Sequence, residues 1–273
     1  MAATGGSGRT TVAALLADEL ASMARTVVLD TAARLTSPWP ESSPAPEGGG
    51  LASLAPDRPL TRSEVLAAGV LRTGPGGPWQ VLTDTRDWHA PPLVLPEPPA
   101  AWYQLAAIGG WQAVVADTTH AVAHDVIAAR CEGRQGQTRG WCELPYSVPL
   151  LCAAATASGV QTLQKAVMAL HAEGLPLHRA VVVLVGVADG RPAPVVRAAG
   201  TMLAARTSAV VHLPYDARIR AHGLAETLRT RSKTRQASAR IAAAVLDAAH
   251  RAWGMPLPAA PVPAALPHSV PAP

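Results

Sequence analysis

The sequence predicts an α/β fold, a three-layer sandwich in which helices cover both faces of a mostly parallel central sheet. Short apolar stretches typical of buried strands recur along the chain, and residues 181–187 (VVVLVGV) are the clearest of them. Segments with apolar side chains at helical spacing separate these stretches. Strands that alternate with helices pair in parallel, because each crossover helix carries the chain back to the same end of the sheet.

The first elements follow directly from this pattern. Apolar residues at three- and four-residue intervals predict a helix over 10–23, and the next stretch, 26–30, predicts a buried strand that ends in an acid. Residues 36–50 are rich in Pro, Ser and Gly. This composition predicts an irregular segment that does not pack, within an insertion that extends over about 36–60.

The remaining elements complete one domain over residues 1–253. Thr61 and Glu64 match the Thr-x-x-Glu capping box and predict the start of a helix. Strands are expected at 79–82, 112–117, 148–155, 180–187 and 209–213, and helices at 100–108, 159–171, 193–205 and 224–253. The Pro-rich tail, 254–273, has no amphipathic period and is expected to be disordered.

Charge, hydropathy and cysteine content exclude several classes of protein. The net charge is +4 with only 15% charged residues, which does not by itself indicate a nucleic-acid-binding protein. The longest strongly apolar run, 181–187, is far shorter than the roughly 20 residues that span a bilayer, so we expect no membrane insertion. Cys131, Cys142 and Cys152 lack CxxC spacing, which argues against a disulfide framework or a zinc site. A reducing cytoplasm is the expected location.

A Gly-rich stretch, Thr4-Gly-Gly-Ser-Gly-Arg-Thr-Thr11, opens the chain. A phosphate-binding loop needs glycines so that backbone N–H groups can approach oxygen atoms, a helix N-terminus, a cation, and a hydroxyl for Mg²⁺. The glycines of this stretch meet the first need, the following helix the second, and Arg9 and Thr10 the last two. A single Gly-rich turn is weak evidence. The later strands that end in Asp30 and Asp117 strengthen it.

This order of elements resembles the MinD/ParA family of P-loop ATPases, whose modified Walker A motif reads Lys-Gly-Gly-x-Gly-Lys-Thr-Thr. Residues 4–11 are similar to this motif, 27–30 to the family's second strand and its acid, and 113–118 to its Walker B segment. Residues 151–160 are similar to the family segment that follows the strand after Walker B, and residues 211–216 are similar to a stretch late in the family's sequences.

The resemblance implies a P-loop NTPase that binds ATP with Mg²⁺. The implied phosphate-binding residues are Gly5, Gly6, Ser7, Gly8, Arg9, Thr10 and Thr11. The implied metal-binding residues are Thr10, Asp30 and Asp117, although an Asp at a strand end can instead cap the next helix or turn. ATP and GTP are not distinguished, because the family's base-recognition residues are not placed.

Several positions depart from the family pattern. Thr4 stands where the family has the lysine that reaches the partner's nucleotide, and Arg9 replaces the lysine that contacts phosphate. Ala32 falls where the family has the acid that positions the attacking water. Because phosphoryl transfer depends on positioning and electrostatics, slow or absent hydrolysis is expected, and no catalytic residue is assigned.

Only residues 1–3 precede the loop, where the family has a central strand. Either the true start lies further upstream, which we favour, or the sheet lacks its central strand. A missing central strand would leave the backbone groups of its neighbours unpaired.

These observations lead to three hypotheses. The first is a cytoplasmic ATP-binding protein whose nucleotide switches its association, as a homodimer or with a protein of a positioning or secretion assembly. The alternative is a pseudo-ATPase interaction scaffold that binds no nucleotide. The further alternative is a DNA-segregation ATPase that binds DNA nonspecifically through a basic cluster. The basic cluster consists of Arg229, Arg231, Lys233, Arg235 and Arg240.

Other candidate sites are weaker. His120 and His124 lie four positions apart on an expected helix, but the sequence places no third metal ligand beside them. Ser147 and Cys142 lack a nucleophile signature such as Gly-x-Ser-x-Gly. We therefore expect neither a metal site nor a catalytic nucleophile at these positions.

Overall fold

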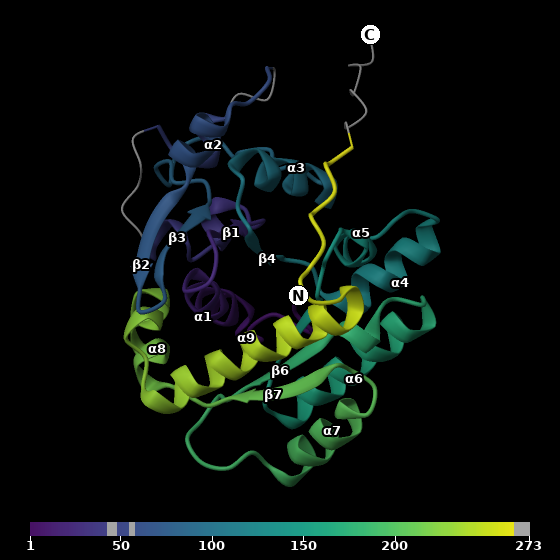
Figure 1. Ribbon diagram of the computed structural model, residues 1–273. Coiled ribbons are helices and arrows are strands. Elements are labelled where there is room, and N and C mark those ends of the chain that lie inside the picture. The colour runs from purple at the N-terminus through teal and green to yellow at the C-terminus, as the bar shows by residue number, and fades with distance from the viewer. Residues whose placement is uncertain (43–47, 55–57, 265–273) are drawn as a thin grey trace.

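The structure, a computed structural model, describes residues 1–42, 48–54 and 58–264 (Figure 1). Its strands form a 4-stranded sheet in the order β2-β3-β1-β4 and a 3-stranded sheet in the order β5-β6-β7. All strand pairs are parallel except β2 with β3. The strands are β1 (Thr26–Asp30), β2 (Val70–Gly74), β3 (Gly77–Leu82), β4 (Ala113–Asp117), β5 (Leu150–Ala154), β6 (Val181–Val185) and β7 (Ala209–Leu213).

The first residues of the chain lie between the two sheets and link them. Ala2 forms parallel bridges with Ala121 on one side and with Cys152 of β5 on the other. The amide of Cys152 donates to the carbonyl of Met1 (3.0 Å), and the amide of Ala3 donates to the carbonyl of Cys152 (2.9 Å). These residues stand where the resemblance predicts a central strand, and they satisfy backbone groups of β5.

Helices cover both faces of the sheet, which confirms the expected three-layer α/β fold (Figure 1). Val28 packs on one face with α1 (Arg9–Ala21) and α9 (Ser232–Trp253). Val27 and Leu29 point to the other face, because successive strand residues alternate. The helices on that face are α2 (Arg62–Ala68), α3 (Pro99–Gly109), α4 (Val122–Glu132), α5 (Gln137–Glu143), α6 (Ala157–Ala172) and α7 (Pro194–Ala204). Within the described residues, none of the helices is both long and apolar enough to cross a membrane.

Several local signals in the sequence are confirmed, and others were too weak to detect. Thr61 and Glu64 form a complete capping box at the start of α2. The strand expected at 209–213 coincides with β7. The sequence did not predict β2 or α8 (Ala217–His222). Because β2 is an edge strand with exposed and buried residues in alternation, it lacks the continuous apolar run that marks the central strands.

The last helix begins later than expected. Residues Gly223–Arg229 form a 3₁₀ helix, and α9 starts only at Ser232. The carboxylate of Asp216 accepts hydrogen bonds from the amide of Arg231 (3.2 Å) and the hydroxyl of Thr234 (2.8 Å). A residue 15 positions before the N-cap residue therefore anchors the start of α9.

The expectation that residues 36–50 do not pack is wrong for Trp39. Short 3₁₀ turns at Arg34–Thr36 and Pro40–Ser42 place this residue in the core, where it is fully buried. Its ring lies edge to face with Trp79, with 6.1 Å between ring centroids. Burial of one large aromatic side chain outweighs the loop-like composition of its neighbours. Residues 43–47 of this segment and 55–57 of the insertion lie outside the described residues.

The first part of the tail runs extended from the end of α9 past α3 (Figure 1). The hydroxyl of Tyr103 in α3 donates to the carbonyl of Pro261 (2.6 Å), and the hydroxyl of Tyr146 donates to the carbonyl of Ala259 (3.3 Å). The rest of the segment expected to be disordered, 265–273, lies outside the described residues.

Candidate nucleotide-binding site

The Gly-rich loop and two strand ends meet at one edge of the sheet. Asp30 and Asp117 are the last residues of β1 and β4 and are register partners in the parallel pair. Arg9, the first residue of α1, contacts Asp117 directly. In open α/β sheets, ligands bind at the carboxyl ends of the strands. The tertiary structure therefore brings together the loop and the carboxylates that the sequence predicts.

The loop presents backbone N–H groups that have no partner in the chain. Gly6 and Gly8 have positive φ angles of 70° and 74°, which glycine adopts without steric cost. The first hydrogen bond of α1 runs from the amide of Val12 to the carbonyl of Gly8 (3.0 Å). Within the described residues, the amides of Gly5, Gly6 and residues 8–11 donate no hydrogen bond. We call these backbone N–H groups of Gly5, Gly6 and residues 8–11 the open amides.

Glycine serves different purposes along the loop. A Cβ atom at Gly5 or Gly6 would meet nothing within 4 Å, so space lies beside the backbone there. A Cβ atom at Gly8 would lie 2.8 Å from a methyl of Val185 in β6. Gly5 and Gly6 thus leave room beside the open amides, whereas Gly8 allows close packing on the sheet. Ser7 is buried, and Thr4, Thr10 and Thr11 are partly exposed.

Arg9 and Trp39 occupy both oxygens of Asp117. The Nε atom of Arg9 lies 2.6 Å from Asp117 Oδ1, and the indole Nε1 of Trp39 donates to Oδ2 at 3.0 Å. The side chain of Asp117 is 3% exposed and that of Arg9 is 22% exposed. The terminal Nη atoms of Arg9 have no hydrogen-bond or ion-pair partner in the described chain. Asp117 therefore ties the start of α1 to the segment that follows β1.

Asp30 also accepts hydrogen bonds on both oxygens. The hydroxyls of Ser37 and Thr83 each donate to Oδ2 at 2.6 Å, and the amide of Ala32 donates to Oδ1 at 3.1 Å. Burial raises the pKa of Asp30 to about 6, although these hydrogen bonds act in the opposite direction. Ala32, the position that the resemblance assigns to a water-positioning acid, contributes its backbone amide to Asp30.

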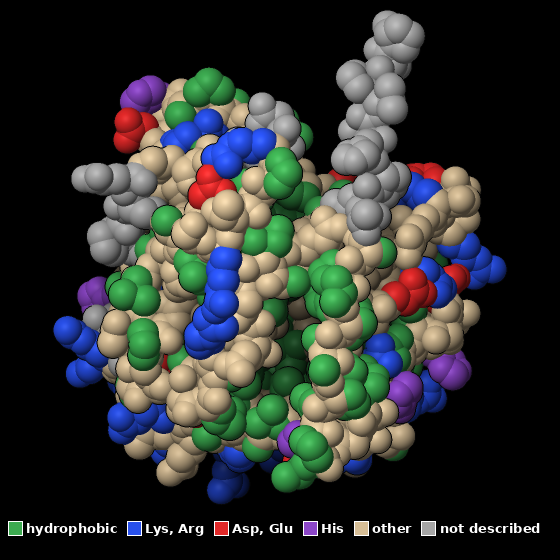
Figure 2. Space-filling model, turned by 45° about the horizontal axis from the view of Figure 1, so that its top comes forward, with side chains coloured by type: hydrophobic (Ala, Val, Ile, Leu, Met, Phe, Trp, Pro, Cys, Tyr) green, Lys and Arg blue, Asp and Glu red, His purple; other side chains and the backbone are tan. Residues whose placement is uncertain are grey.

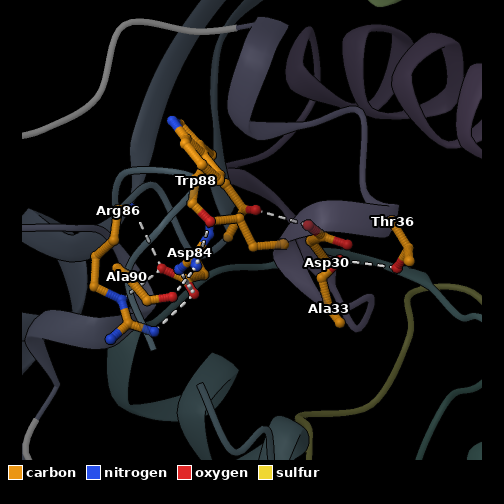
Figure 3. Close-up of polar contacts among 9 residues, drawn as sticks. Asp30, Ala33, Thr36, Asp84, Arg86, Trp88 and Ala90 are labelled. Atoms are coloured by element: carbon orange, nitrogen blue, oxygen red, sulfur yellow. Dashed lines mark hydrogen bonds and ion pairs between the residues drawn. The ribbon is translucent and has the colours of Figure 1, made fainter. Parts of the chain in front are cut away.

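A third buried carboxylate, Asp84, follows β3 and is paired with arginines. Arg34 Nη1 and Arg86 Nη2 each lie 2.9 Å from Asp84 Oδ2, and the contact with Arg86 is drawn in Figure 3. Burial by itself would raise the pKa of Asp84. The hydrogen bonds and charge of Arg86, with the charge of Arg34, hold it below its ordinary value. This carboxylate is engaged within the protein.

The arrangement fits a polyphosphate, whereas the two engaged aspartates do not fit as direct ligands of a magnesium ion. The open amides and the space at Gly5 and Gly6 suit phosphate oxygens. Magnesium requires oxygen ligands in near-octahedral geometry at about 2.0–2.1 Å. Each oxygen of Asp30 and Asp117 already accepts a hydrogen bond from the chain itself. Among the residues that the structure describes, no group of three His, Cys, Asp or Glu could hold a metal ion.

The structure does not support His120 and His124 as a metal site or Cys142 as a nucleophile. His120 precedes α4, whereas the exposed His124 lies within it, so the two histidines do not share a helix. Burial lowers the pKa of His120 to about 4. Burial raises the pKa of the Cys142 thiol to about 11, which disfavours a reactive thiolate.

All residues of the basic cluster are exposed: Arg229 and Arg231 precede α9, and Lys233, Arg235 and Arg240 lie within it. On the face drawn in Figure 2, Lys and Arg side chains are dispersed among polar and hydrophobic ones.

Sequence reasoning missed the residues that bind the two aspartates. Trp39 and Ser37 lie in a segment whose composition indicates a loop, and Thr83 follows a predicted strand. The one available signal was Trp39 itself, a large apolar residue within a Pro- and Ser-rich stretch. Nothing in the local sequence reveals its partner Asp117, which lies 78 positions away.

Comparisons with solved structures identify the fold. The cell division ATPase MinD of Pyrococcus furiosus has a TM-score of 0.50 with 20% identity, over 89% of this chain and 95% of that chain. A ParA family ATPase from Chlorobium tepidum has a TM-score of 0.51 with 12% identity, over the same shares of the two chains. The chain has the MinD/ParA-like P-loop ATPase fold. No protein-family model and no curated protein sequence matches it.

The MinD/ParA-like fold explains the placement of the candidate site. In this chain the Gly-rich loop joins the central position of the sheet to α1, and the ends of β1 and β4 flank it. The predicted resemblance is thus confirmed at the level of the fold.

Proposed function

We propose that this protein binds the polyphosphate of a nucleotide such as ATP at residues 5–11 and uses bound and free states as a switch, with little or no hydrolysis. The observation that carries this proposal is the set of open amides beside Gly5 and Gly6. An anion at the N-terminus of a helix gains from the unpaired N–H groups and from the helix dipole.

Weak hydrolysis follows from what surrounds the loop. Ala32 has no carboxylate to orient a water molecule, and Thr4 provides no cation. Because phosphoryl transfer depends on such positioned groups, their loss slows chemistry more than it weakens binding. Within this proposal, the switch acts in the cytoplasm and changes association between two copies or with a protein of a positioning or secretion assembly.

A second candidate is an interaction scaffold that binds no nucleotide. The contacts of Asp30, Asp84 and Asp117 favour it, because these carboxylates are satisfied without any ligand. The two candidates differ in one respect that can be measured, namely whether the open amides bind phosphate.

A titration with a fluorescent ATP analogue separates the two candidates. Gly5→Asp places a negative charge beside the open amides without steric conflict, since a Cβ atom there meets nothing within 4 Å. Gly174→Asp is the control, because Gly174 is distant in sequence and a Cβ atom there also meets nothing within 4 Å; its φ of 65° is strained for a side chain, but less so for Asp than for most residues.

We expect saturable binding by the wild type and Gly174→Asp, weakened at least about tenfold in Gly5→Asp by charge repulsion. Absence of binding in all three folded proteins would reject the nucleotide switch in favour of the scaffold. Equal binding in all three would place the ligand elsewhere.

A further inference from the structure

Building on the proposed function, we propose that Arg9 takes the place of the divalent cation at this site, so that the protein binds nucleotide phosphate without Mg²⁺. In this arrangement the Nε atom of Arg9 holds Asp117, and its two Nη atoms donate to the phosphate.

The contacts of Asp117 carry the first step. Arg9 Nε lies 2.6 Å from Oδ1 and Trp39 Nε1 lies 3.0 Å from Oδ2. Each oxygen of Asp117 thus already accepts a hydrogen bond, and the adjacent Arg9 guanidinium repels a second cation from the remaining lone pairs. The guanidinium already neutralises the charge of this carboxylate, which is 3% exposed. Displacing it would leave Arg9 without its ion-pair partner.

The shape of the arginine side chain carries the second step. A guanidinium has donors on all three of its nitrogens, arranged in a rigid plane. In Arg9 the Nε–H is used by Asp117, while the Nη atoms have no partner in the described chain and the side chain is 22% exposed. A lysine has one nitrogen on a flexible stem and no planar fork, so it does not present two donor edges in this way. Arg9 therefore joins Asp117 to an anion at the open amides.

Asp30 does not supply an alternative metal ligand. Its Oδ2 accepts two hydroxyl hydrogen bonds and its Oδ1 accepts the amide of Ala32. A divalent cation placed between the two aspartates would also be repelled by the adjacent Arg9 guanidinium.

The test measures affinity for ATP in excess Mg²⁺ and in excess EDTA by isothermal titration calorimetry. For the wild type, we expect the two dissociation constants to agree within about threefold, since no metal ligand is formed by the carboxylates. Titration with Mg²⁺ alone is expected to give no saturable heat. This comparison uses only the unaltered chain.

Arg9→Lys tests the residue itself. The three donors of a lysine ammonium share one nitrogen on a flexible stem, so they do not reproduce the fixed spacing by which the guanidinium donates to Asp117 from one nitrogen and to phosphate from two others. We therefore expect EDTA to weaken ATP binding by about tenfold or more in this variant. Arg25→Lys is the matched control, because the Arg25 guanidinium binds the carbonyl of Gly110 away from the loop. Arg25→Lys should behave as the wild type.

The outcomes separate this inference from the function on which it rests. Wild-type binding that requires Mg²⁺ would overturn the inference and leave the nucleotide switch standing. Absence of ATP binding under both conditions, in a protein that melts cooperatively, would reject both. Equal affinities in the wild type, with Mg²⁺ dependence only in Arg9→Lys, would support both.

Discussion

Two groups of polar atoms lie at the same edge of the sheet, and they differ in whether the chain itself supplies their hydrogen-bond partners. The open amides of Gly5, Gly6 and residues 8–11 are donors without partners in the described chain. The carboxylates of Asp30 and Asp117 lie at the same sheet edge, and each of their oxygens accepts a hydrogen bond from the chain.

This difference indicates which residues serve ligand binding and which serve the stability of the fold. The first N–H groups of a helix have no partner within the helix, so the open amides are available to an external acceptor and contribute little to the stability of the fold. Buried carboxylates without partners would be costly, and the chain provides those partners itself. Substitutions among the carboxylates and their donors should therefore change stability, whereas substitutions beside the open amides should change binding.

The largest effect is expected at Trp39. Trp39→Ala removes a fully buried ring that packs on Trp79 and deprives Asp117 of a donor. Truncation of a buried aromatic costs about 3–5 kcal/mol in the free energy of unfolding. Urea denaturation of Trp39→Ala beside Trp39→Phe, which keeps most of the ring packing, measures this loss. A loss below that of Trp39→Phe would contradict the structural role.

The next effect is a dependence of stability on pH that is due to Asp30. Its pKa in the folded protein is raised from 3.8 to about 6, so the protonated form stabilises the fold. That contribution is fully present below about pH 4 and is lost as the pH rises through about 6, a change of about 3 kcal/mol.

Asp30→Asn should remove this dependence. The half-buried His120, with a pKa lowered to about 4, contributes a slope of opposite sign over a similar pH range. Because His120 is present in both proteins, the difference between wild type and Asp30→Asn in denaturant midpoints isolates the Asp30 contribution. A difference that does not vary between pH 4 and 7 would show that Asp30 is not perturbed.

A smaller effect is expected from one of the donors to Asp30. Ser37→Ala removes the hydroxyl that lies 2.6 Å from Oδ2, and loss of a hydrogen bond to a charged carboxylate costs about 1.5–3 kcal/mol above pH 6. Ser42→Ala, in the same segment, is the comparison, since its hydroxyl does not contact Asp30. Thermal melts at neutral and acidic pH should show a larger deficit for Ser37→Ala at neutral pH, where Asp30 is charged.

The smallest effect on stability is expected at the loop. Gly5→Asp adds a side chain in open space and should change the free energy of unfolding by less than about 0.5 kcal/mol, even while it abolishes most phosphate binding. Circular dichroism melts of the proteins used for the ATP titration provide this value. A large destabilisation would mean that the loop is structural and would remove the contrast between the two regions.

Local sequence patterns predicted the strands and helices that form the site edge of the sheet, but not the side-chain contacts between them. The apolar run of β6, the capping box at Thr61 and the strand ending in Asp30 each depend on a few neighbouring residues. The irregular composition around Trp39 concealed a core residue, because its partners Trp79 and Asp117 come from other strands. Asp216 was likewise unrecognisable as the residue that sets the start of α9.

The sequence by itself determined the alternation of strands and helices and the Gly-rich turn before α1, since spacing and residue type act over short distances. Only the tertiary structure decided that Arg9 would bind Asp117 and that the aspartates would be satisfied internally while the amides of the loop stay open. Those outcomes depend on which side chains the fold brings within hydrogen-bond distance, and residues far apart in the chain carry no local mark of that proximity.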